Sequence, residues 1–337
     1  MRDERNYSLK AHNTFGIEAK CSRFLEYETD EEAIEVAEIV RKELLPYIII
    51  GGGSNLLLTK DFDGIVVRSA IKGHFFEEDD SCERMTCGSG EVWDDMVARS
   101  IEAGYYGMEN LSLIPGDVGA SAVQNIGAYG MEASDLILCV SMIEIATGKL
   151  WMIGNEECEY GYRQSRFKKD WKNRFLITRV TYGLSRTFRP HLEYGNIRSE
   201  LERKGIAEPT AQQLRDTIID IRNAKLPDPK VEGNAGSFFM NPVVTRKKYE
   251  KLAVLYPEMP HYKVDSRHEK IPAGWMIEQC GWKGKTLGRA GVHDKQALVL
   301  VNRGGATGAE IVALCDAIRK DVKGTFGIDI YPEVNII

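Results

Sequence analysis

Two glycine-rich segments constrain the fold of this chain more than any other feature of its sequence. The first, Gly51-Gly-Gly-Ser-Asn55, follows a buried-strand pattern at residues 47–50 and precedes another at residues 64–68. Successive backbone N–H groups beside glycines can hold a pyrophosphate, because no Cβ stands in the way. The segment lacks the G-x-x-x-x-G-K-S/T pattern and opens no long helix, which disfavours a P-loop NTPase and a Rossmann site. A plain turn is the alternative.

The second segment, residues 113–130, combines small residues and backbone donors with the amides of Gln124 and Asn125. This inventory suits close packing against a flat, polar ring system that main-chain groups would bind. A glycine-rich structural Ω-loop is the alternative. Together the two segments indicate one long ligand that touches both, such as a dinucleotide.

Composition narrows the class of protein. A chain of 337 residues with 43% apolar and 28% charged residues is typical of a globular protein with two or three domains. The net charge of −6 argues against nonspecific nucleic-acid binding, which needs a cationic surface. The sequence has no apolar run long enough for a membrane span and no apolar signal core at its start, so we expect a cytoplasmic protein.

Cysteine and histidine spacing gives no sign of a metal site. The seven cysteines form no C-x-x-C pair, and the six histidines form no H-x-x-x-H pattern. We therefore expect reduced structural thiols and no metal. The cysteines are Cys21, Cys82, Cys87, Cys139, Cys158, Cys280 and Cys315.

Hydrophobic periodicity predicts helices at residues 30–45, 91–103, 210–224 and 307–323. The last two open with capping boxes, Thr210-x-x-Gln213 and Thr307-x-x-Glu310, in which side chains bind the free N–H groups of the first turn. The glycine-rich stretch at residues 105–135 is expected to be mostly loop. Short strands and turns should alternate over residues 138–189, and residues 328–336 should form a final strand. The predicted class is α+β or mixed α/β.

One serine occupies a distinctive place in the segment Asn234-Ala-Gly-Ser-Phe-Phe-Met-Asn-Pro242. Ser237 lies between Gly236 and two aromatic rings, and the proline-stiffened run Lys225-Leu-Pro-Asp-Pro-Lys230 precedes it. A hydroxyl held there beside apolar walls could take part in proton transfer. A rigid surface loop whose serine caps a turn is the alternative.

The pairing of Gly-Gly-Gly-Ser-Asn with Ile-Pro-Gly-x-x-Gly-x-x-x-x-Gln-Asn-Ile-Gly-Ala-Tyr-Gly resembles the FAD-binding domain of the UDP-N-acetylenolpyruvoylglucosamine reductase (MurB) family. Further motifs follow in the family's order over nearly the whole chain: Asn13-Thr-Phe-Gly16, Gly161-Tyr-Arg-Gln-Ser165, Lys225-Leu-Pro-Asp-Pro-Lys230, Gly236-Ser-Phe-Phe239 with Asn241-Pro242, Ala273-Gly-Trp275, His293 with Gln296-Ala297, and Pro332-Glu-Val334. Glu193-Tyr-Gly195 resembles the tyrosine loop of the family's longer form.

The resemblance implies an α+β fold with an FAD-binding domain of the MurB and vanillyl-alcohol-oxidase (PCMH) type. Its two subdomains would cover residues 1–70 and 71–226, with residues 328–337 returning to the second. An α+β substrate-binding domain would cover residues 227–327.

The implied activity is reduction of UDP-N-acetylenolpyruvoylglucosamine to UDP-N-acetylmuramate in peptidoglycan precursor synthesis. NADPH reduces FAD, hydride passes from flavin N5 to the enolpyruvyl group, and a proton completes the reduction. The implied partners are these small molecules, with no nucleic acid and no membrane, and the implied state is a cytoplasmic monomer.

Three residues match the family's catalytic positions. Arg163 would bind the enolpyruvyl carboxylate through its planar donor fork. Glu333, when protonated, would donate a hydrogen bond to the developing enolate. Ser237 would protonate the carbanion carbon. Taken alone, Arg163 and Glu333 have the plain alternative of solvated surface charges.

The remaining matches concern binding. The expected cofactor residues are Gly51, Gly52, Gly53, Ser54, Asn55, Ile114, Pro115, Gly116, Gly119, Ala120, Ser121, Gln124, Asn125, Gly127 and Tyr129. The expected substrate residues are Tyr194, Arg222, Lys225, Asn241 and Gln296. Asp294-Lys295, just before Gln296, departs from the family's pattern, which leaves the substrate contact there open.

Two rival functions are consistent with parts of the pattern. Another FAD-dependent oxidase on the same scaffold, acting on small alcohols or lactones, would keep the glycine segments without needing Arg163, Ser237 and Glu333 together. A non-catalytic regulator that binds a flavin or a nucleotide sugar would not need those three residues either.

Overall fold

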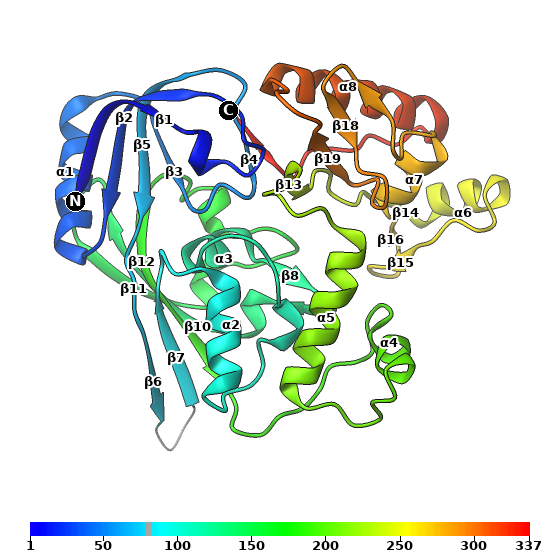
Figure 1. Cartoon of the computed structure of the whole chain (residues 1–337), viewed down its shortest axis with the longest axis horizontal. Coiled ribbons are helices and arrows are strands. Elements are labelled where there is room, and N and C mark those ends of the chain that lie inside the picture. The colour runs from blue at the N-terminus through cyan, green and yellow to red at the C-terminus, as the bar shows by residue number, and fades with distance from the viewer. Residues whose placement is uncertain (79–82) are drawn as a thin grey trace. The chain divides into compact units, whose positions relative to one another are not determined.

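The computed structural model describes residues 1–78 and 83–337, and Cys82 lies outside them. The chain divides into two compact units (Figure 1). Unit 1 comprises Met1–Tyr7, Cys21–Gly52 and Phe62–Ala224, and unit 2 comprises Ser8–Lys20, Gly53–Asp61 and Lys225–Ile337.

Unit 1 contains most of the regular structure in the first two thirds of the chain. Its helices are α1 (Asp30–Glu43), α2 (Trp93–Glu102), α3 (Val118–Gln124), α4 (Ile197–Arg203) and α5 (Ala211–Lys225). Its strands are β1 (Arg2–Ser8), β2 (Lys20–Tyr27), β3 (Tyr47–Ile50), β5 (Phe62–Ser69), β6 (His74–Glu78), β7 (Glu83–Gly88), β8 (Gly127–Ala128), β9 (Met131–Glu132), β10 (Ile137–Glu144), β11 (Leu150–Gly154) and β12 (Phe175–Leu184).

The first sheet of unit 1 has the order β1-β2-β5-β3, in which β2, β5 and β3 run parallel. Strands β3 and β5 confirm the two strand patterns on either side of the first glycine segment. Helix α1 packs on this sheet through buried residues such as Val36 and Val40 (Figure 1). The helix ends two residues earlier than predicted, because Leu44 takes a left-handed conformation at φ 52°.

The second sheet of unit 1 is antiparallel, in the order β11-β10-β12-β7-β6. It confirms the alternation of strands and turns predicted for residues 138–189. Trp93 of α2 packs edge-on against Tyr182 of β12 at a ring-centroid distance of 5.5 Å, in a core that also holds residues of α3. Helix α5 begins with the predicted capping box, since Gln213 N–H binds Thr210 Oγ1 and Thr210 N–H binds Gln213 Oε1.

The prediction that residues 105–135 are mostly loop misses a helix. Residues Val118–Gln124 form α3, which packs against β12 and β7. Small residues make this possible: an added Cβ on Gly119 would lie 3.0 Å from the Cβ of Ser89. The abundance of glycine therefore reflects close helix packing as well as turns.

Unit 2 holds the elements around the serine segment. Its helices are α6 (Arg246–Leu255), α7 (Ala273–Gln279) and α8 (Gly308–Phe326). Its strands are β4 (Leu56–Leu57), β13 (Gly233–Ser237), β14 (Val243–Thr245), β15 (Tyr262–Lys263), β16 (His268–Lys270), β17 (Thr286–Leu287), β18 (Ala290–Val292), β19 (Val299–Asn302) and β20 (Asn335–Ile336). The main sheet has the order β13-β19-β18-β17, a smaller sheet has the order β14-β16-β15, and α8 contacts β18 and β19 (Figure 1).

The prediction of one continuous strand at residues 328–336 is wrong. Only Asn335–Ile336 form a strand, β20, which pairs in parallel with β4. Pro332 lacks an N–H group and so cannot donate to a continuous ladder. The preceding segment makes an isolated bridge to Phe239, flanked by bonds from Met240 N–H to Tyr331 O and from Glu333 N–H to Phe238 O.

The six described cysteines are free thiols, as expected. Burial raises the pKa of Cys87 and Cys315 to about 12, which fits structural rather than reactive thiols. None of the helices in the described residues has the length and apolar character needed to cross a bilayer.

Two glycines of α8 should respond in opposite ways to alanine. A Cβ on Gly308 would lie 2.0 Å from the backbone oxygen of Leu58, whereas a Cβ on Gly324 would meet nothing within 4 Å. We expect Gly308→Ala to lower the free energy of unfolding by about 2 kcal/mol or more. The matched control Gly324→Ala should raise it by about 0.5–1 kcal/mol, because alanine has the higher helix propensity. Urea unfolding of the full chain measures both, and similar losses in the two variants would contradict the packing described.

The capping box of α8 should make stability depend on pH. The Arg289 guanidinium, with the N–H and hydroxyl of Thr307, lowers the pKa of Glu310 to about 2 from an ordinary value of 4.5. Because the folded pKa is depressed, the stabilisation is present above pH 4.5 and is lost as pH falls towards 2. Glu310→Gln should therefore lower the urea midpoint at neutral pH, and its difference from the parent chain should shrink in acid. A difference that stays constant with pH, or that equals the effect of Glu258→Gln, would count against this origin.

Candidate active site

In unit 1 the start of the first glycine segment lies against the second. A Cβ on Gly51 would lie 3.3 Å from Ala120 Cβ, and a Cβ on Gly52 would lie 3.1 Å from Asp117 Oδ1 and 3.5 Å from Gly116 Cα. Glycine at 51 and 52 therefore lets the two segments approach each other closely. One long ligand such as FAD could touch both. Burial raises the pKa of Asp117, against the opposing charge of Arg68.

Helix α3 carries several of the expected cofactor residues, and their polar groups are held in different ways. The hydroxyl of Ser121 binds Val118 O and Tyr182 OH, both at 2.7 Å, so it serves the packing of the helix. Asn125, at φ 46°, ends α3 and is fully buried. Its Nδ2 binds Gly161 O and Glu132 Oε2, and its Oδ1 accepts from Ser134 N–H.

The turn that carries Arg163 is fastened to the end of α3. Gly161 and Gln164 exchange backbone hydrogen bonds across the turn, and Arg163 takes a left-handed conformation at φ 54°. Its guanidinium binds Gly127 O and, at 3.3 Å, Asn125 O. Lys168 Nζ binds both Gln124 Oε1 at 3.1 Å and Arg163 O at 3.0 Å. These contacts bring Arg163, Gln124, Asn125 and Gly127 together, as one site requires.

A second arginine lies near Arg163. Burial lowers the pKa of Arg222, and Arg163 adds to the lowering through its charge. Arg222 Nε is buried and has no hydrogen-bond partner among the described residues. A buried guanidinium N–H with this geometry fits an anionic ligand, because its desolvation is otherwise uncompensated. Burial also raises the pKa of neighbouring Tyr129, whose carbonyl accepts from Asn110 Nδ2 at 2.9 Å.

The remaining unit 1 residues have simpler surroundings. Ile114 packs against the core of the second sheet. Gly116 accepts a hydrogen bond from Trp93 N–H at 3.0 Å, which anchors the second glycine segment on α2. Tyr194 is about half exposed and lies against Gly130, where an added Cβ would approach the tyrosine Cβ to 3.3 Å.

An ion pair that the sequence did not reveal supports the second glycine segment. Asp94 of α2 binds Arg215 of α5 through both guanidinium Nη atoms, at 2.6 and 2.9 Å. The same carboxylate accepts Leu113 N–H at 2.5 Å, and Leu113 has a left-handed φ of 57°. Asp94 therefore sets the conformation just before Ile114-Pro115-Gly116. No local sequence signal joins residues 121 positions apart.

In unit 2 the serine segment and the Pro-Glu-Val segment lie side by side. Phe238 N–H binds Leu298 O at 2.7 Å, and Phe238 O accepts Glu333 N–H at 2.8 Å. Phe238 and Phe239 are buried, whereas Ser237 is exposed at the end of β13. The structure thus places Ser237 one residue from the peptide that binds Glu333. Arg163 belongs to unit 1.

The rest of the first glycine segment also lies in unit 2. Gly53 has φ 70°, and an added Cβ would lie 2.0 Å from His12 O, so only glycine fits. Gly53 O accepts Thr14 N–H at 3.1 Å, which joins the Asn-Thr-Phe-Gly motif to this loop. Asn55 Nδ2 donates to Glu333 O at 3.3 Å, and Asn55 O accepts Asn335 N–H. Residues 53–55 therefore adjoin the segment that carries Glu333, with Ser54 between Gly53 and Asn55.

The side chains of two expected substrate residues accept hydrogen bonds from nearby backbone N–H groups. Asn241 Oδ1 accepts Ala273 N–H at 2.9 Å at the start of α7. Gln296 Oε1 accepts Leu298 N–H at 3.3 Å and would lie 3.2 Å from a Cβ on Gly274. Lys225 is exposed at the end of α5.

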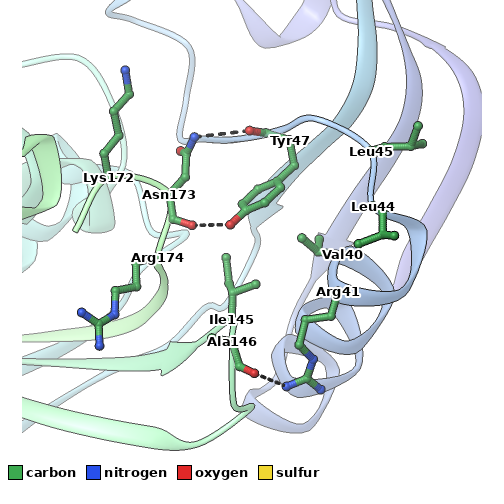
Figure 2. Close-up of a pocket in the computed structure, with 10 residues that line it drawn as sticks. All are labelled: Val40, Arg41, Leu44, Leu45, Tyr47, Ile145, Ala146, Lys172, Asn173 and Arg174. Carbon is green, nitrogen blue, oxygen red and sulfur yellow. Dashed lines mark hydrogen bonds between the residues drawn. The ribbon is translucent and has the colours of Figure 1, made fainter. Parts of the chain in front are cut away.

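Figure 2 shows a surface pocket of about 490 Å³ in unit 1 that none of the expected site residues lines. Tyr47 and Asn173 close one side by exchanging two hydrogen bonds, and Arg41 donates to Ala146 O at 3.2 Å. The pocket is therefore separate from the residues assigned to catalysis. Its lining residues are Val40, Arg41, Leu44, Leu45, Tyr47, Ile145, Ala146, Lys172, Asn173 and Arg174.

Two family models match different parts of the chain. Residues 22–154 match an FAD binding domain. Residues 228–337 match the UDP-N-acetylenolpyruvoylglucosamine reductase C-terminal domain.

Curated relatives decide the family. A UDP-N-acetylenolpyruvoylglucosamine reductase of Bacteroides fragilis (strain YCH46) is 53% identical over 336 residues, covering 99% of this chain and 100% of the relative. The chain belongs to the UDP-N-acetylenolpyruvoylglucosamine reductase (MurB) family. Reductases of Flavobacterium johnsoniae and Paraburkholderia phymatum are 45% and 44% identical, over 100% and 97% of this chain and 100% and 96% of their own lengths.

A solved structure supports the fold. The crystal structure of UDP-N-acetylenolpyruvylglucosamine reductase from Thermus caldophilus aligns with a TM-score of 0.68 at 23% identity, covering 100% of this chain and 99% of that one. The predicted fold class, an FAD-binding domain of the PCMH type with a family-specific C-terminal domain, is confirmed. The chain is an FAD-dependent oxidoreductase of peptidoglycan precursor synthesis that uses NADPH, which confirms the predicted enzyme class and cofactors.

The contact between Arg163 and Gly127 can be tested with two glycine variants. A Cβ on Gly127 would lie 2.6 Å from Arg163 Nη1 and 2.8 Å from Met131 O, so Gly127→Ala must displace the arginine. We expect kcat/KM for the enolpyruvyl UDP-sugar to fall about 10²-fold, as misplacement of about 1 Å can cause. In the matched control Gly161→Ala, the nearest atom to the new Cβ is at 4.0 Å, and activity should change less than about twofold. Steady-state kinetics of both FAD-loaded proteins measures this, and equal losses would refute it.

Proposed function

We propose that Arg163, Ser237 and Glu333 carry out the reduction of UDP-N-acetylenolpyruvoylglucosamine to UDP-N-acetylmuramate in this chain. The observation that most supports the assignment is the backbone bond between Phe238 O and Glu333 N–H, because it keeps the proposed proton donor and the proposed acid in adjacent segments. When bound, FAD supplies the hydride that it receives from NADPH. The protein's own part is to bind the substrate, stabilise the developing anion and deliver one proton.

Ser237 is the proposed proton donor to the carbanion carbon. Its neighbours in sequence fix its position: Gly236 has φ 68°, and the ring of Phe238 is fully buried. The Asn234 side chain also accepts Gly236 N–H at 2.9 Å, which closes the turn before the serine. A small hydroxyl fixed in this way can protonate one face of a planar carbon, which suits a stereospecific reduction.

Glu333 is the proposed hydrogen-bond donor to the developing enolate. Its own backbone N–H binds Phe238 O, and its carbonyl accepts from Asn55 Nδ2, so the main chain is held from both sides. A donor whose main chain is already ordered needs little reorganisation when negative charge develops. The carboxyl group must be protonated for this role.

Arg163 is the proposed partner of the enolpyruvyl carboxylate. Its left-handed backbone and its bonds to Asn125 O and Gly127 O orient the guanidinium plane. A planar fork in a fixed orientation binds a carboxylate with two parallel hydrogen bonds. Arg163 would therefore stabilise the negative charge of that carboxylate.

Binding of the UDP-sugar is assigned to five further residues. The buried, unpartnered Nε of Arg222 and the exposed ammonium of Lys225 suit an anionic diphosphate. Tyr194, Asn241 and Gln296 would bind through polar groups. FAD would be held by the cofactor residues of both glycine segments named above.

The chain would be organised in three parts. Residues 1–70 and 71–226 would be the two FAD-binding subdomains, and residues 227–327 would be the substrate-binding domain. The C-terminal residues 328–337 are expected to return to the second subdomain, but β20 pairs with β4, which lies within residues 1–70. The Glu193-Tyr-Gly195 element would mark the longer form of the family. The protein would act as a cytoplasmic monomer with neither nucleic acid nor membrane as a partner.

Replacement of the proposed proton donor should separate the two half-reactions. In Ser237→Ala, NADPH should reduce bound FAD at nearly the parent rate, because no proton from Ser237 is needed. Reoxidation of the reduced protein by the enolpyruvyl UDP-sugar should slow at least 100-fold, given that a positioned proton donor contributes roughly 10²–10⁴ in rate. Stopped-flow absorbance of the flavin measures both steps.

The control for this experiment is Ser266→Ala, which changes an exposed serine elsewhere in unit 2. Both of its half-reactions should match the parent protein. Equal slowing of the two half-reactions in Ser237→Ala would rule out the assigned role. Rapid peroxide-forming oxidation of NADPH that ignores the UDP-sugar would favour the oxidase alternative.

A further inference from the structure

Arg303 joins two segments of unit 2 that lead to proposed site residues. Its Nη1 binds Glu232 Oε1 at 2.6 Å, and its Nη2 binds Asp294 Oδ1 at 2.8 Å and Val292 O at 3.1 Å. The other carboxylate oxygen of Glu232 lies 3.3 Å from His293 Nδ1. One guanidinium thus holds two carboxylates from different parts of the chain.

Each carboxylate stands just before a residue assigned to the reaction. Glu232 immediately precedes β13, the strand that ends in Ser237. Asp294 lies two positions before Gln296 in the loop between β18 and β19. The two segments also meet directly, since Phe238 N–H binds Leu298 O. A shift of either segment would therefore change the position of Ser237 relative to Gln296.

The strand pairing alone fixes these segments incompletely. β13 pairs with β19 at Gly233↔Asn302 and Asn234↔Val301, but the register shifts before Ser237↔Val299. An irregularity of this kind disrupts the hydrogen-bond ladder locally and bends the strand. Arg303 directly follows Asn302, so its ion pair with Glu232 fixes the entry of β13 at the end where the pairing is regular.

The neighbouring backbone leaves room for the guanidinium in this position. A Cβ on Gly291 of β18 would lie 2.8 Å from Arg303 Nε and 3.2 Å from Arg303 Cγ. Glycine at 291 therefore allows the arginine to cross β18 and reach both carboxylates. The same arrangement explains Asp294, which departs from the family's pattern: here it is an acceptor for Arg303.

We propose that Arg303 is a positioning residue for the reduction of the enolpyruvyl UDP-sugar. By binding Glu232 and Asp294 together, it holds the strand of Ser237 and the loop of Gln296 in the arrangement that the substrate requires. This inference rests on the proposed function of Ser237 and Gln296. Arg303 itself acts through these segments.

The two ion pairs of Arg303 differ in exposure. The side chains of Arg303 and Asp294 retain 28% and 66% of their accessible surface, whereas that of Glu232 retains 19%. The pair with Asp294 should therefore contribute little to the free energy of unfolding, and the pair with Glu232 should contribute more. Arginine is required because its planar fork can bind two acceptors at fixed angles, whereas lysine is a single point charge.

The decisive variant is Arg303→Met in the full-length, FAD-loaded protein. We expect the Kd of the oxidised protein for the enolpyruvyl UDP-sugar, measured by calorimetry without NADPH, to rise about tenfold. Reoxidation of the reduced protein by saturating substrate should also slow about tenfold, because small misplacements of reacting groups are costly in rate. Reduction by NADPH should stay within about threefold of the parent rate, and urea unfolding should show that the variant remains folded. Arg303→Lys should recover only part of the loss.

Two controls separate positioning from a general loss of structure. Arg289→Met removes another exposed ion pair, with Glu310, at a residue whose backbone O accepts Arg303 N–H, and it should leave substrate binding unchanged. Glu232→Gln should cause part of the Arg303→Met loss, and the double variant should be no worse than Arg303→Met, because both act through one ion pair.

Equal losses in both half-reactions, or additive effects of Arg303→Met and Glu232→Gln, would overturn the inference. Parent-like substrate binding in Arg303→Met would also overturn it. Ser237→Ala distinguishes this from failure of the proposed function: if it slows the substrate half-reaction while Arg303→Met does not, only the positioning role is lost. If Ser237→Ala has no effect, the function assigned to the serine fails first.

Discussion

The two backbone hydrogen bonds of Phe238 are the interactions on which the proposed catalytic residues of unit 2 depend. Its N–H binds Leu298 O and its carbonyl accepts Glu333 N–H, so one residue connects the serine segment, the loop of Gln296 and the C-terminal segment. The buried rings of Phe238 and Phe239 anchor this part of the backbone in the core. The hydroxyl of Ser237, one residue away, is therefore held in a fixed position although it is exposed. A proton donor must be exposed in this way to reach a substrate.

In unit 1 the corresponding constraint is the left-handed turn at Arg163. A non-glycine residue at φ 54° is held there by the paired bonds of Gly161 and Gln164 and by the guanidinium bonds to two carbonyls. A strained backbone conformation at a functional residue is kept only where several surrounding contacts hold that residue in place. The glycine at 127 belongs to this arrangement, since a Cβ there would collide with the arginine.

The sequence predicts those parts of the fold that local patterns determine. The helices with capping boxes and the strands around the first glycine segment are confirmed, because cap residues and runs of β-branched residues act on their own neighbours. Helix α3 was missed because its glycine is explained only by contact with Ser89, far away in sequence. The predicted final strand is too long because the pattern of apolar residues favours a strand across residues 328–336, whereas Pro332 has no N–H group to donate to the ladder.

The same distinction separates the site residues that motifs identify from the residues that support them. Motifs point to Ser237, Glu333 and Arg163 because the chemistry needs those groups, but Asp94–Arg215 and Arg303–Glu232 join residues 121 and 71 positions apart. No local pattern marks such pairs, because in the sequence either partner alone is an ordinary charged residue. Their roles follow from their positions in the structure. Asp94 fixes the left-handed Leu113 before the second glycine segment, and Arg303 fixes the start of β13, whose pairing is irregular. Residues that only orient others can differ between relatives without changing the chemistry, which is why support of this kind must be found in the structure.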